Sequence, residues 1–237
     1  MILYYLRHGD PIYSPDNLTP LGHEQARALA KRLATYGLDE IYSSDSNRAM
    51  LTAQPTCDLL KKEKTICPWA NEGVAWGELT VINEEGNRRW GFHHAPTVDL
   101  FNSPEIRALG DEWYDHPFFE GTKFKEGMLR IRREVDDFLL SLGYRHVREE
   151  AAYDAVNPSE KRVALFAHQG FGLAFLSCIL DIPYPLFSTH FDLSHSSMTV
   201  IDFSGKGKIR PKVLQSSNDS HLYREGLLTG YNNGTRI

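Results

Sequence analysis

The fold that we expect follows first from one stretch near the start of the 237-residue chain, Ile2-Leu3-Tyr4-Tyr5-Leu6-Arg7-His8-Gly9. Residues 2–6 form a continuous apolar and aromatic run, which is typical of a buried strand. Gly9 and Pro11 then mark a turn. Arg7 and His8 therefore stand at the carboxyl end of a predicted strand, where open α/β sheets bind their ligands.

Strand and helix patterns alternate along the rest of the chain. Thr19 and Pro20 suit the N-cap and the first position of a helix, and Gly37 is placed to end it. Further strands are predicted at residues 39–43, 65–68, 162–167, 197–203 and 212–215. Further helices are predicted at about 46–60, 125–142 and 171–180. The alternation predicts an α/β fold, a three-layer sandwich with a mainly parallel central sheet and helices on both faces. Pro55 lies inside the predicted helix 46–60, so this helix could have a kink or end early.

Residues 80–125 interrupt this alternation. They are rich in aromatic residues and show no clean period, so we expect one domain over 1–237 with an insertion or cap at 80–125. All four tryptophans fall between positions 69 and 113. The aromatic residues of the insertion can form a small core of their own or line a substrate pocket, and the sequence leaves both open.

A second histidine stands in the same kind of place as His8. His168 follows the predicted strand 162–167, although 160 positions separate it from His8. Because the carboxyl ends of parallel strands meet at one edge of a sheet, we expect His8, His168 and Arg7 in one crevice.

Composition and charge exclude several classes of function. The formal net charge is −5 and no basic run stands out, so nothing supports binding to nucleic acid. The three cysteines form no CxxC pair, which argues against a disulfide framework or a zinc site. No apolar stretch reaches the roughly 18 residues of a membrane span, and no signal peptide is evident, so we expect a cytoplasmic protein without a membrane partner. The sequence is also compatible with a homodimer.

Four motifs occur in a recognisable order. They are Leu6-Arg7-His8-Gly9, the segment Ser43-Ser44-Asp45-Ser46-Asn47-Arg48-Ala49-Met50-Leu51-Thr52-Ala53, Asn71-Glu72, and Ala167-His168-Gln169-Gly170. Together they resemble the histidine phosphatase superfamily, the phosphoglycerate mutase-like enzymes, over roughly residues 1–80 and 160–220. Asp45 stands where that family usually has Pro, and Pro11-Ile12-Tyr13 replaces polar residues that help to hold phosphate in many members.

The resemblance implies roles for individual residues. His8 would be the nucleophile that forms a phosphohistidine, Glu72 the proton donor and acceptor, and His168 a further catalytic group. Arg7, Arg48 and Gln169 would bind the substrate phosphate, since an Arg fork suits phosphate oxygens. No metal and no cofactor are expected, because the arginines supply the positive charge. The predicted partner is a small phosphorylated metabolite.

The resemblance implies a metal-independent phosphatase acting on a small phosphomonoester. The alternative is a phosphoglycerate mutase, which returns the phosphoryl group to another hydroxyl, and the changed stretch after Gly9 weakens this alternative. A non-catalytic phospho-ligand binder is the third hypothesis. Glu78 could replace Glu72 as the acid, and His93, His94 and His116 could form a metal site, although solvent or pocket-lining roles fit them better.

Overall fold

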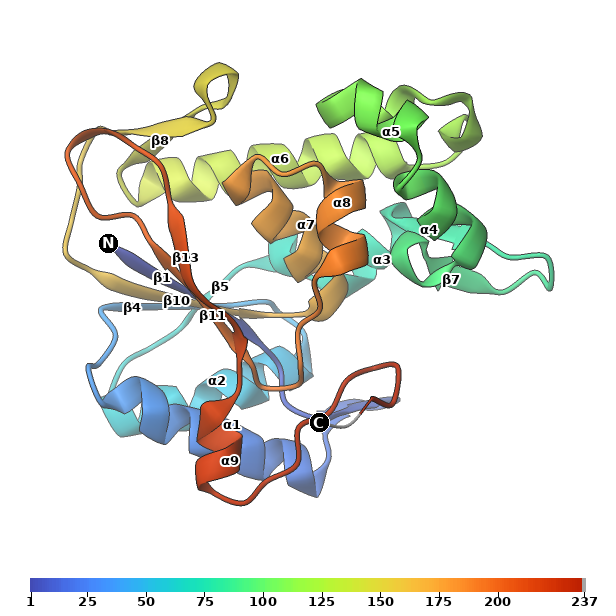
Figure 1. The fold of residues 1–237 in the computed structure, drawn as a ribbon. Helices are drawn as coiled ribbons and strands as arrows, with labels where there is room; N and C mark the ends of the chain where they lie inside the picture. Colours follow the sequence, from blue (N-terminus) through green and yellow to red (C-terminus); the bar gives the residue numbers. More distant parts are fainter. Residues whose placement is uncertain (236–237) are drawn as a thin grey trace.

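The chain folds around a mixed six-stranded sheet with helices on both faces (Figure 1). The computed structural model describes residues 1–235. In spatial order the strands are β13 (Lys212–Asn218), β11 (Met198–Asp202), β1 (Ile2–Arg7), β10 (Arg162–Ala167), β4 (Glu40–Ser43) and β5 (Thr65–Ile66). β1, β10, β4 and β5 run parallel, whereas β11 is antiparallel to both of its neighbours. The predicted α/β class with a mainly parallel sheet is confirmed.

The alternation of side chains along β1 builds the three layers. Leu3 and Tyr5 belong to the larger apolar cluster, and Leu6 belongs to the smaller one on the opposite face. The smaller cluster is covered by the helices α1 (Pro20–Ala34) and α2 (Asn47–Leu60), next to which lies α9 (Ser220–Arg224). The larger cluster is covered by α3 (Glu72–Glu78), α6 (Phe124–Ser141), α7 (Gln169–Leu180) and α8 (Tyr184–His190).

The beginning of α1 agrees with its sequence signals. The Thr19 side chain accepts a hydrogen bond from the Gly22 amide at 3.0 Å, and Pro20 is the first helical residue. α2 runs through Pro55 and ends only at Leu60, because Lys61 adopts a left-handed conformation. The helix therefore does not end early at Pro55.

Smaller elements surround the main sheet, and most of them were not predicted. They are the hairpins β2 (Pro11–Tyr13) with β3 (Asp16–Leu18) and β6 (Thr80–Ile82) with β7 (Arg88–Trp90), and the sheet of β8 (Tyr144–Val147), β9 (Ala152–Ala155) and β12 (Gly207–Ile209). The predicted strand 65–68 is shorter than expected, since Pro68 begins a 3-10 turn.

Residues 80–125 fold beside α6 and α8. Besides β6 and β7 they contain α4 (Ala95–Phe101), α5 (Pro104–Leu109) and the 3-10 turns Gly91–His93, Gly110–Asp115 and Pro117–Phe119. Phe101, Trp113 and Phe119 are buried and pack against one another and against Tyr184 of α8. Most of the aromatic residues here therefore extend the larger apolar cluster rather than form a core of their own. Within residues 1–235 no helix is both long and apolar enough to cross a membrane.

Candidate active site

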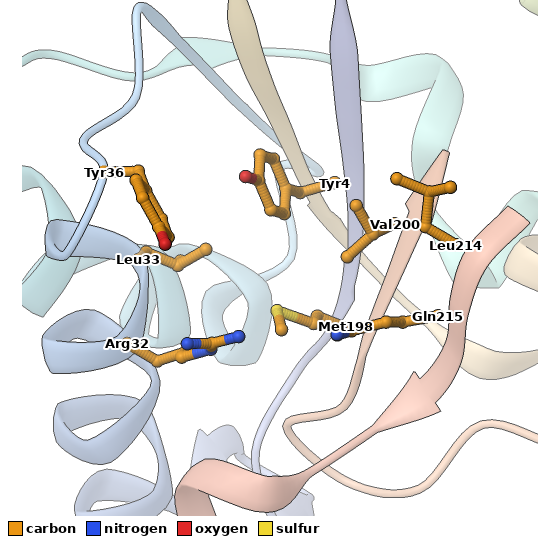
Figure 2. A pocket seen from close by; sticks show the side chains of 8 residues that line it. All are labelled: Tyr4, Arg32, Leu33, Tyr36, Met198, Val200, Leu214 and Gln215. Atoms are coloured by element: carbon orange, nitrogen blue, oxygen red, sulfur yellow. The ribbon is translucent and has the colours of Figure 1, made fainter. Parts of the chain in front are cut away.

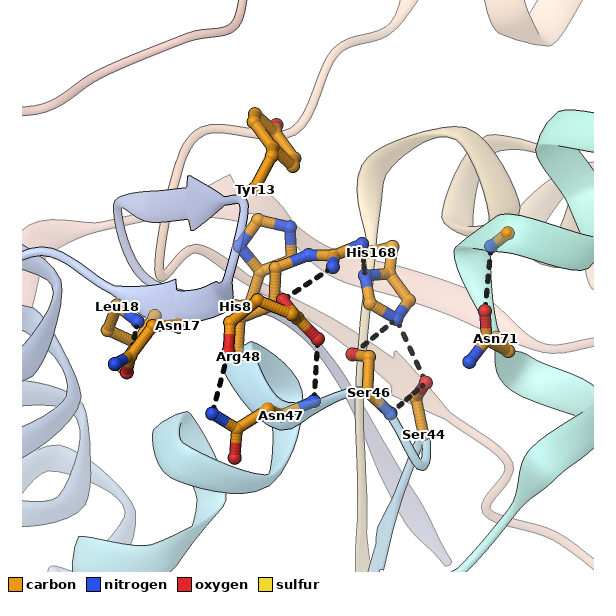
Figure 3. A network of polar contacts seen from close by, with 12 residues as sticks. His8, Tyr13, Asn17, Leu18, Ser44, Ser46, Asn47, Arg48, Asn71 and His168 are labelled. Atoms are coloured by element: carbon orange, nitrogen blue, oxygen red, sulfur yellow. Dashed lines mark hydrogen bonds and ion pairs between the residues drawn. The ribbon is translucent and has the colours of Figure 1, made fainter.

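Strand register brings the two predicted histidines together. β1 and β10 pair in parallel with Arg7 opposite Ala167, so the residues that follow both strands, His8 and His168, leave the sheet side by side. The His8 amide donates to the Ala167 carbonyl at 3.0 Å. The two rings are buried, with centroids 5.3 Å apart and planes at 61° (Figure 3). The expected crevice is thus present at the carboxyl edge of the sheet.

A backbone contact sets the tautomer of His8. Its Nδ1 lies 2.8 Å from the Gly9 carbonyl oxygen. A carbonyl only accepts, so Nδ1 carries the proton and Nε2 keeps a free electron pair. Burial lowers the pKa of His8 well below its ordinary value, and electrostatic interactions with His168, Arg7 and Arg48 act in the same direction. The ring is therefore neutral near pH 7.

His168 is oriented from both ring nitrogens. Nδ1 accepts from Arg48 Nη2 at 3.2 Å, and Nε2 lies 2.9 Å from Ser44 Oγ and 3.2 Å from Ser46 Oγ (Figure 3). An Arg can only donate, so the proton of the neutral ring is on Nε2. Burial, followed by Arg48 and Arg7, lowers the pKa of His168 well below its ordinary value.

Arg48, at the start of α2, connects this pair to the hairpin β2–β3. Its Nη1 donates to Asp16 Oδ1 at 2.8 Å, and its guanidinium lies 5.4 Å from the centroid of the Tyr13 ring. Tyr13 is 61% exposed, so this contact stands at the mouth of the site. The hairpin that replaces the expected polar stretch thus faces the site with a tyrosine.

Arg7 is fully buried, and its Nη atoms donate to the Leu193 carbonyl and the Asn232 side chain. Within residues 1–235, Nε of Arg7 and Nε of Arg48 are both buried without a hydrogen-bond partner. A buried unpaired donor costs free energy, so each arginine retains a donor for an anionic ligand.

Glu72 is the first residue of α3. Its Oε1 accepts from the Gly170 amide and its Oε2 from the Phe171 amide, both at 2.9 Å, at the first turn of α7. Burial raises the pKa of Glu72 above its ordinary value, although these two amides and the nearby arginines act in the opposite direction. The alternative acid, Glu78, is held elsewhere by Arg130, whose Nη2 lies 2.6 Å from Glu78 Oε2.

Gln169 is buried, and it is linked to Arg7 through the Asn232 side chain. Its amide nitrogen donates to Asp192, and its Oε1 accepts from Asn232 Nδ2 at 2.7 Å. Apart from Glu72, the predicted site residues therefore form two groups. One contains His8, His168 and Arg48, and the other joins Gln169 to Arg7 through Asn232.

His195 and Asn232 belong to this site and were not predicted. The His195 ring stacks near His8 with centroids 6.0 Å apart, and its Nε2 lies 3.0 Å from Asn232 Oδ1. Burial, with Arg7, lowers the pKa of His195 to about 4. The predicted strand 197–203 offered a signal for His195, because an antiparallel neighbour of β1 begins at the edge where β1 ends. No pattern in the sequence pointed to Asn232.

A cavity of about 400 Å³ opens at the site. It is lined by Arg48 and Glu72 and also by Tyr13, Gly73, Trp76, Trp90 and Asn232. A separate pocket of about 180 Å³ lies between α1 and the strands β1, β11 and β13 (Figure 2). Tyr4, Leu33 and Tyr36 line this second pocket, and none of the predicted site residues does.

The histidines of the insertion have local partners. His94 Nδ1 lies 2.8 Å from Thr97 Oγ1, and His116 Nδ1 accepts from the Phe118 amide at 3.2 Å, while His93 is exposed. Across residues 1–235, no group of three or more His, Cys, Asp or Glu side chains is arranged to hold a metal ion.

Three comparisons with known proteins agree with this geometry. The profile of the histidine phosphatase superfamily (branch 1) matches residues 3–100. A protein of Hydrogenobacter thermophilus, provisionally named phosphoserine phosphatase 2, is 28% identical over 146 residues, which are 58% of this chain and 64% of that relative. The chain thus spans less than two thirds of that curated relative.

Solved structures share the fold at lower identity. A mycobacterial glucosyl-3-phosphoglycerate phosphatase with inorganic phosphate has a TM-score of 0.60 and 19% identity, over 93% of this chain and 98% of that one. A phosphoserine phosphatase of Entamoeba histolytica with 3-phosphoglyceric acid has a TM-score of 0.57 and 18% identity over the same shares. The matched profile shows that residues 3–100 are similar to the histidine phosphatase superfamily (branch 1), the same family that the four ordered motifs resemble, and the solved structures show that the fold is shared over most of the chain.

Proposed function

We propose that this chain hydrolyses a small phosphomonoester without a metal ion, through a phosphohistidine on His8. The observation that carries the proposal is the state of His8. Its Nδ1 proton is held by the Gly9 carbonyl, and its ring lies beside His168 and, through it, Arg48. A neutral ring with a free Nε2 electron pair is the form of histidine that attacks phosphorus.

In the first step, Nε2 of His8 bonds to phosphorus while the bond from phosphorus to the ester oxygen breaks. The departing oxygen takes a proton from Glu72, whose pKa is raised by burial and which is therefore more readily protonated than an exposed glutamate. In the second step, water attacks phosphorus, its proton passes to Glu72, and the N–P electron pair returns to His8. The products are an alcohol and inorganic phosphate.

Arg7 and Arg48 supply the positive charge. A phosphomonoester carries about two negative charges near neutral pH. The free Nε atoms of the two arginines can donate hydrogen bonds to the phosphate oxygens. The His168 ring lies beside the His8 ring as a further group of the site. In a loose transition state the equatorial oxygens hold the charge, so fixed donors here accelerate the transfer.

The test uses the purified chain, a chelator, p-nitrophenyl phosphate and a panel of phosphorylated metabolites. We expect wild type to release phosphate and His8→Ala to lose this activity, with a phosphorylated His8 detectable by mass spectrometry after rapid quenching. Equal activity of the two proteins would refute the proposal. Conversion of 3-phosphoglycerate to 2-phosphoglycerate faster than to free phosphate would identify the mutase alternative instead.

A further inference from the structure

We infer that the cavity beside Glu72 selects phosphomonoesters of uncharged alcohols that carry an apolar, flat group, and rejects phosphorylated carboxylic acids. The inference rests on the proposed function and names its substrate class. It concerns the part of the cavity that the phosphate does not need, which is lined by Tyr13, Gly73, Trp76, Trp90 and Asn232.

The wall of this cavity is aromatic and lies beside the proposed acid. Trp76 stands four residues after Glu72 in α3, so both side chains lie on one face of that helix. The rings of Trp76 and Trp90 contact each other edge to face, with centroids 5.0 Å apart. An alcohol that leaves from phosphorus next to Glu72 therefore leaves along two indole rings.

Trp90 is held firmly in this place. A Cβ atom at Gly170 would lie 2.4 Å from the Trp90 ring, so the indole packs directly on the backbone that binds Glu72. The Phe92 ring stacks on the Trp90 ring at a centroid distance of 5.5 Å, and Trp90 is only 8% exposed. A preformed apolar surface binds a flat group without first paying for ordering of the side chain.

The charges around the cavity disfavour a second anion. Of its lining residues within the described part of the chain, Arg48 alone is cationic, and it already pairs with Asp16 at 2.8 Å. The phosphate would occupy the remaining donors of Arg48 and Arg7. A carboxylate on the substrate would then meet Glu72, indole rings and an amide, with no cation to balance its desolvation.

A cavity of about 400 Å³ accommodates a one-ring alcohol with its phosphate, and it lies within the usual range for ligand sites. Aromatic contact and burial of a ring contribute on the order of one power of ten in kcat/KM. The expected selectivity is therefore large enough to measure with matched esters.

Three esters separate the effects of ring and charge. Glycerol 3-phosphate and 3-phosphoglycerate differ by a carboxylate in place of a hydroxymethyl group, and benzyl phosphate carries a ring in place of the carbons with the two free hydroxyl groups. We expect kcat/KM for phosphate release to be about tenfold higher for glycerol 3-phosphate than for 3-phosphoglycerate, and about tenfold higher again for benzyl phosphate.

Variants of Trp76 assign the preference to the wall. Trp76→Ala should remove the advantage of benzyl phosphate over glycerol 3-phosphate, whereas Trp76→Phe should retain it. Trp76→Arg should raise the relative kcat/KM for 3-phosphoglycerate. Tyr36→Ala is the control, because Tyr36 is 71% exposed and lines only the distant pocket (Figure 2).

Faster hydrolysis of 3-phosphoglycerate than of glycerol 3-phosphate would overturn the inference while leaving the proposed function intact. The inference would also be overturned if Trp76→Ala changed kcat/KM equally for all three esters while its thermal unfolding matched that of wild type. Failure of the proposed function has a different signature, since no ester would then release phosphate beyond the level of His8→Ala.

Discussion

Gly170 lies so close to Trp90 that a Cβ atom at position 170 would fall 2.4 Å from the indole ring. This contact joins the insertion of residues 80–125 to the first turn of α7, where the Gly170 amide also binds Glu72. The absence of a side chain at one position thus connects the aromatic wall, the proposed acid and the second histidine motif.

Gly170→Ala should destabilise the protein by about 1–3 kcal/mol, because a rigid ring and backbone must move apart. It should also lower kcat/KM, since Glu72 loses its fixed position. Urea unfolding and phosphate release measure the two effects. Gly77→Ala is the control, because Gly77 lies in α3 with open space around it, so this change should stabilise the protein by roughly 0.5–1 kcal/mol. Equal behaviour of the two variants would contradict the packing argument.

Glu72→Gln should lower kcat for alkyl phosphates by about 10²–10⁴-fold, because an amide cannot donate the proton that the leaving oxygen needs. The loss for p-nitrophenyl phosphate should be smaller, since nitrophenolate leaves without a proton. Glu78→Gln serves as the control, because Glu78 is engaged by Arg130. A larger loss with Glu78→Gln would assign the acid to that residue.

The pH dependence of the wild-type rate should follow from two groups whose pKa values are shifted, His8 and Glu72. The pKa of His8 is lowered, so its nucleophilic form persists well into the acidic range, and the pKa of Glu72 is raised, so its protonated form persists above the ordinary range. The rate should therefore fall at high pH as Glu72 deprotonates, and Glu72→Gln should lack this fall. The comparison uses kcat of both proteins for phosphate release from benzyl phosphate, whose alcohol needs a proton to leave, and an unchanged alkaline limb in the variant would contradict the assignment.

Ser44 and Ser46 should act redundantly on His168. Either hydroxyl can accept the Nε2 proton, at 2.9 Å and 3.2 Å, so each single change to Ala should lower kcat only about two- to fivefold. The double variant should lose more than the product of both, because the buried donor is then left unpaired. Ser43→Ala is the control, since Ser43 is equally buried but donates to the Ser44 carbonyl. Strictly multiplicative effects would show that the two hydroxyls act independently.

His146 should make stability depend on pH. Its ring nitrogens lie 3.0 Å from Asp136 and 2.8 Å from Asp181, and these bonds outweigh burial and raise its pKa. A raised folded pKa gives stability that is fully present below the unfolded value of about 6.5 and is lost as pH rises through the folded value. His146→Gln should be less stable by about 1–3 kcal/mol at pH 6, with a smaller difference at pH 9. Urea unfolding at both values tests this, and a constant difference would contradict it.

Local sequence patterns predicted the layers of the fold and the placement of His8 and His168 at the carboxyl ends of two strands. The apolar run of residues 2–6, the N-cap Thr19 and the strand before His168 are local signals, and local physics produced the elements they predict. The elements missed, such as the hairpin β2–β3, are short and held mainly by contacts with distant segments. Roles for the site residues remain proposals that the experiments above address.

Which of these groups meet depends on the tertiary structure. The register of β1 on β10 sets His8 beside His168, the antiparallel direction of β11 brings in His195, and the C-terminal segment delivers Asn232 to Arg7. The distance between Trp90 and Gly170 likewise follows from how the insertion packs on α7. Such contacts join residues far apart in the chain and depend on the summed packing of the whole core, so no local pattern encodes them.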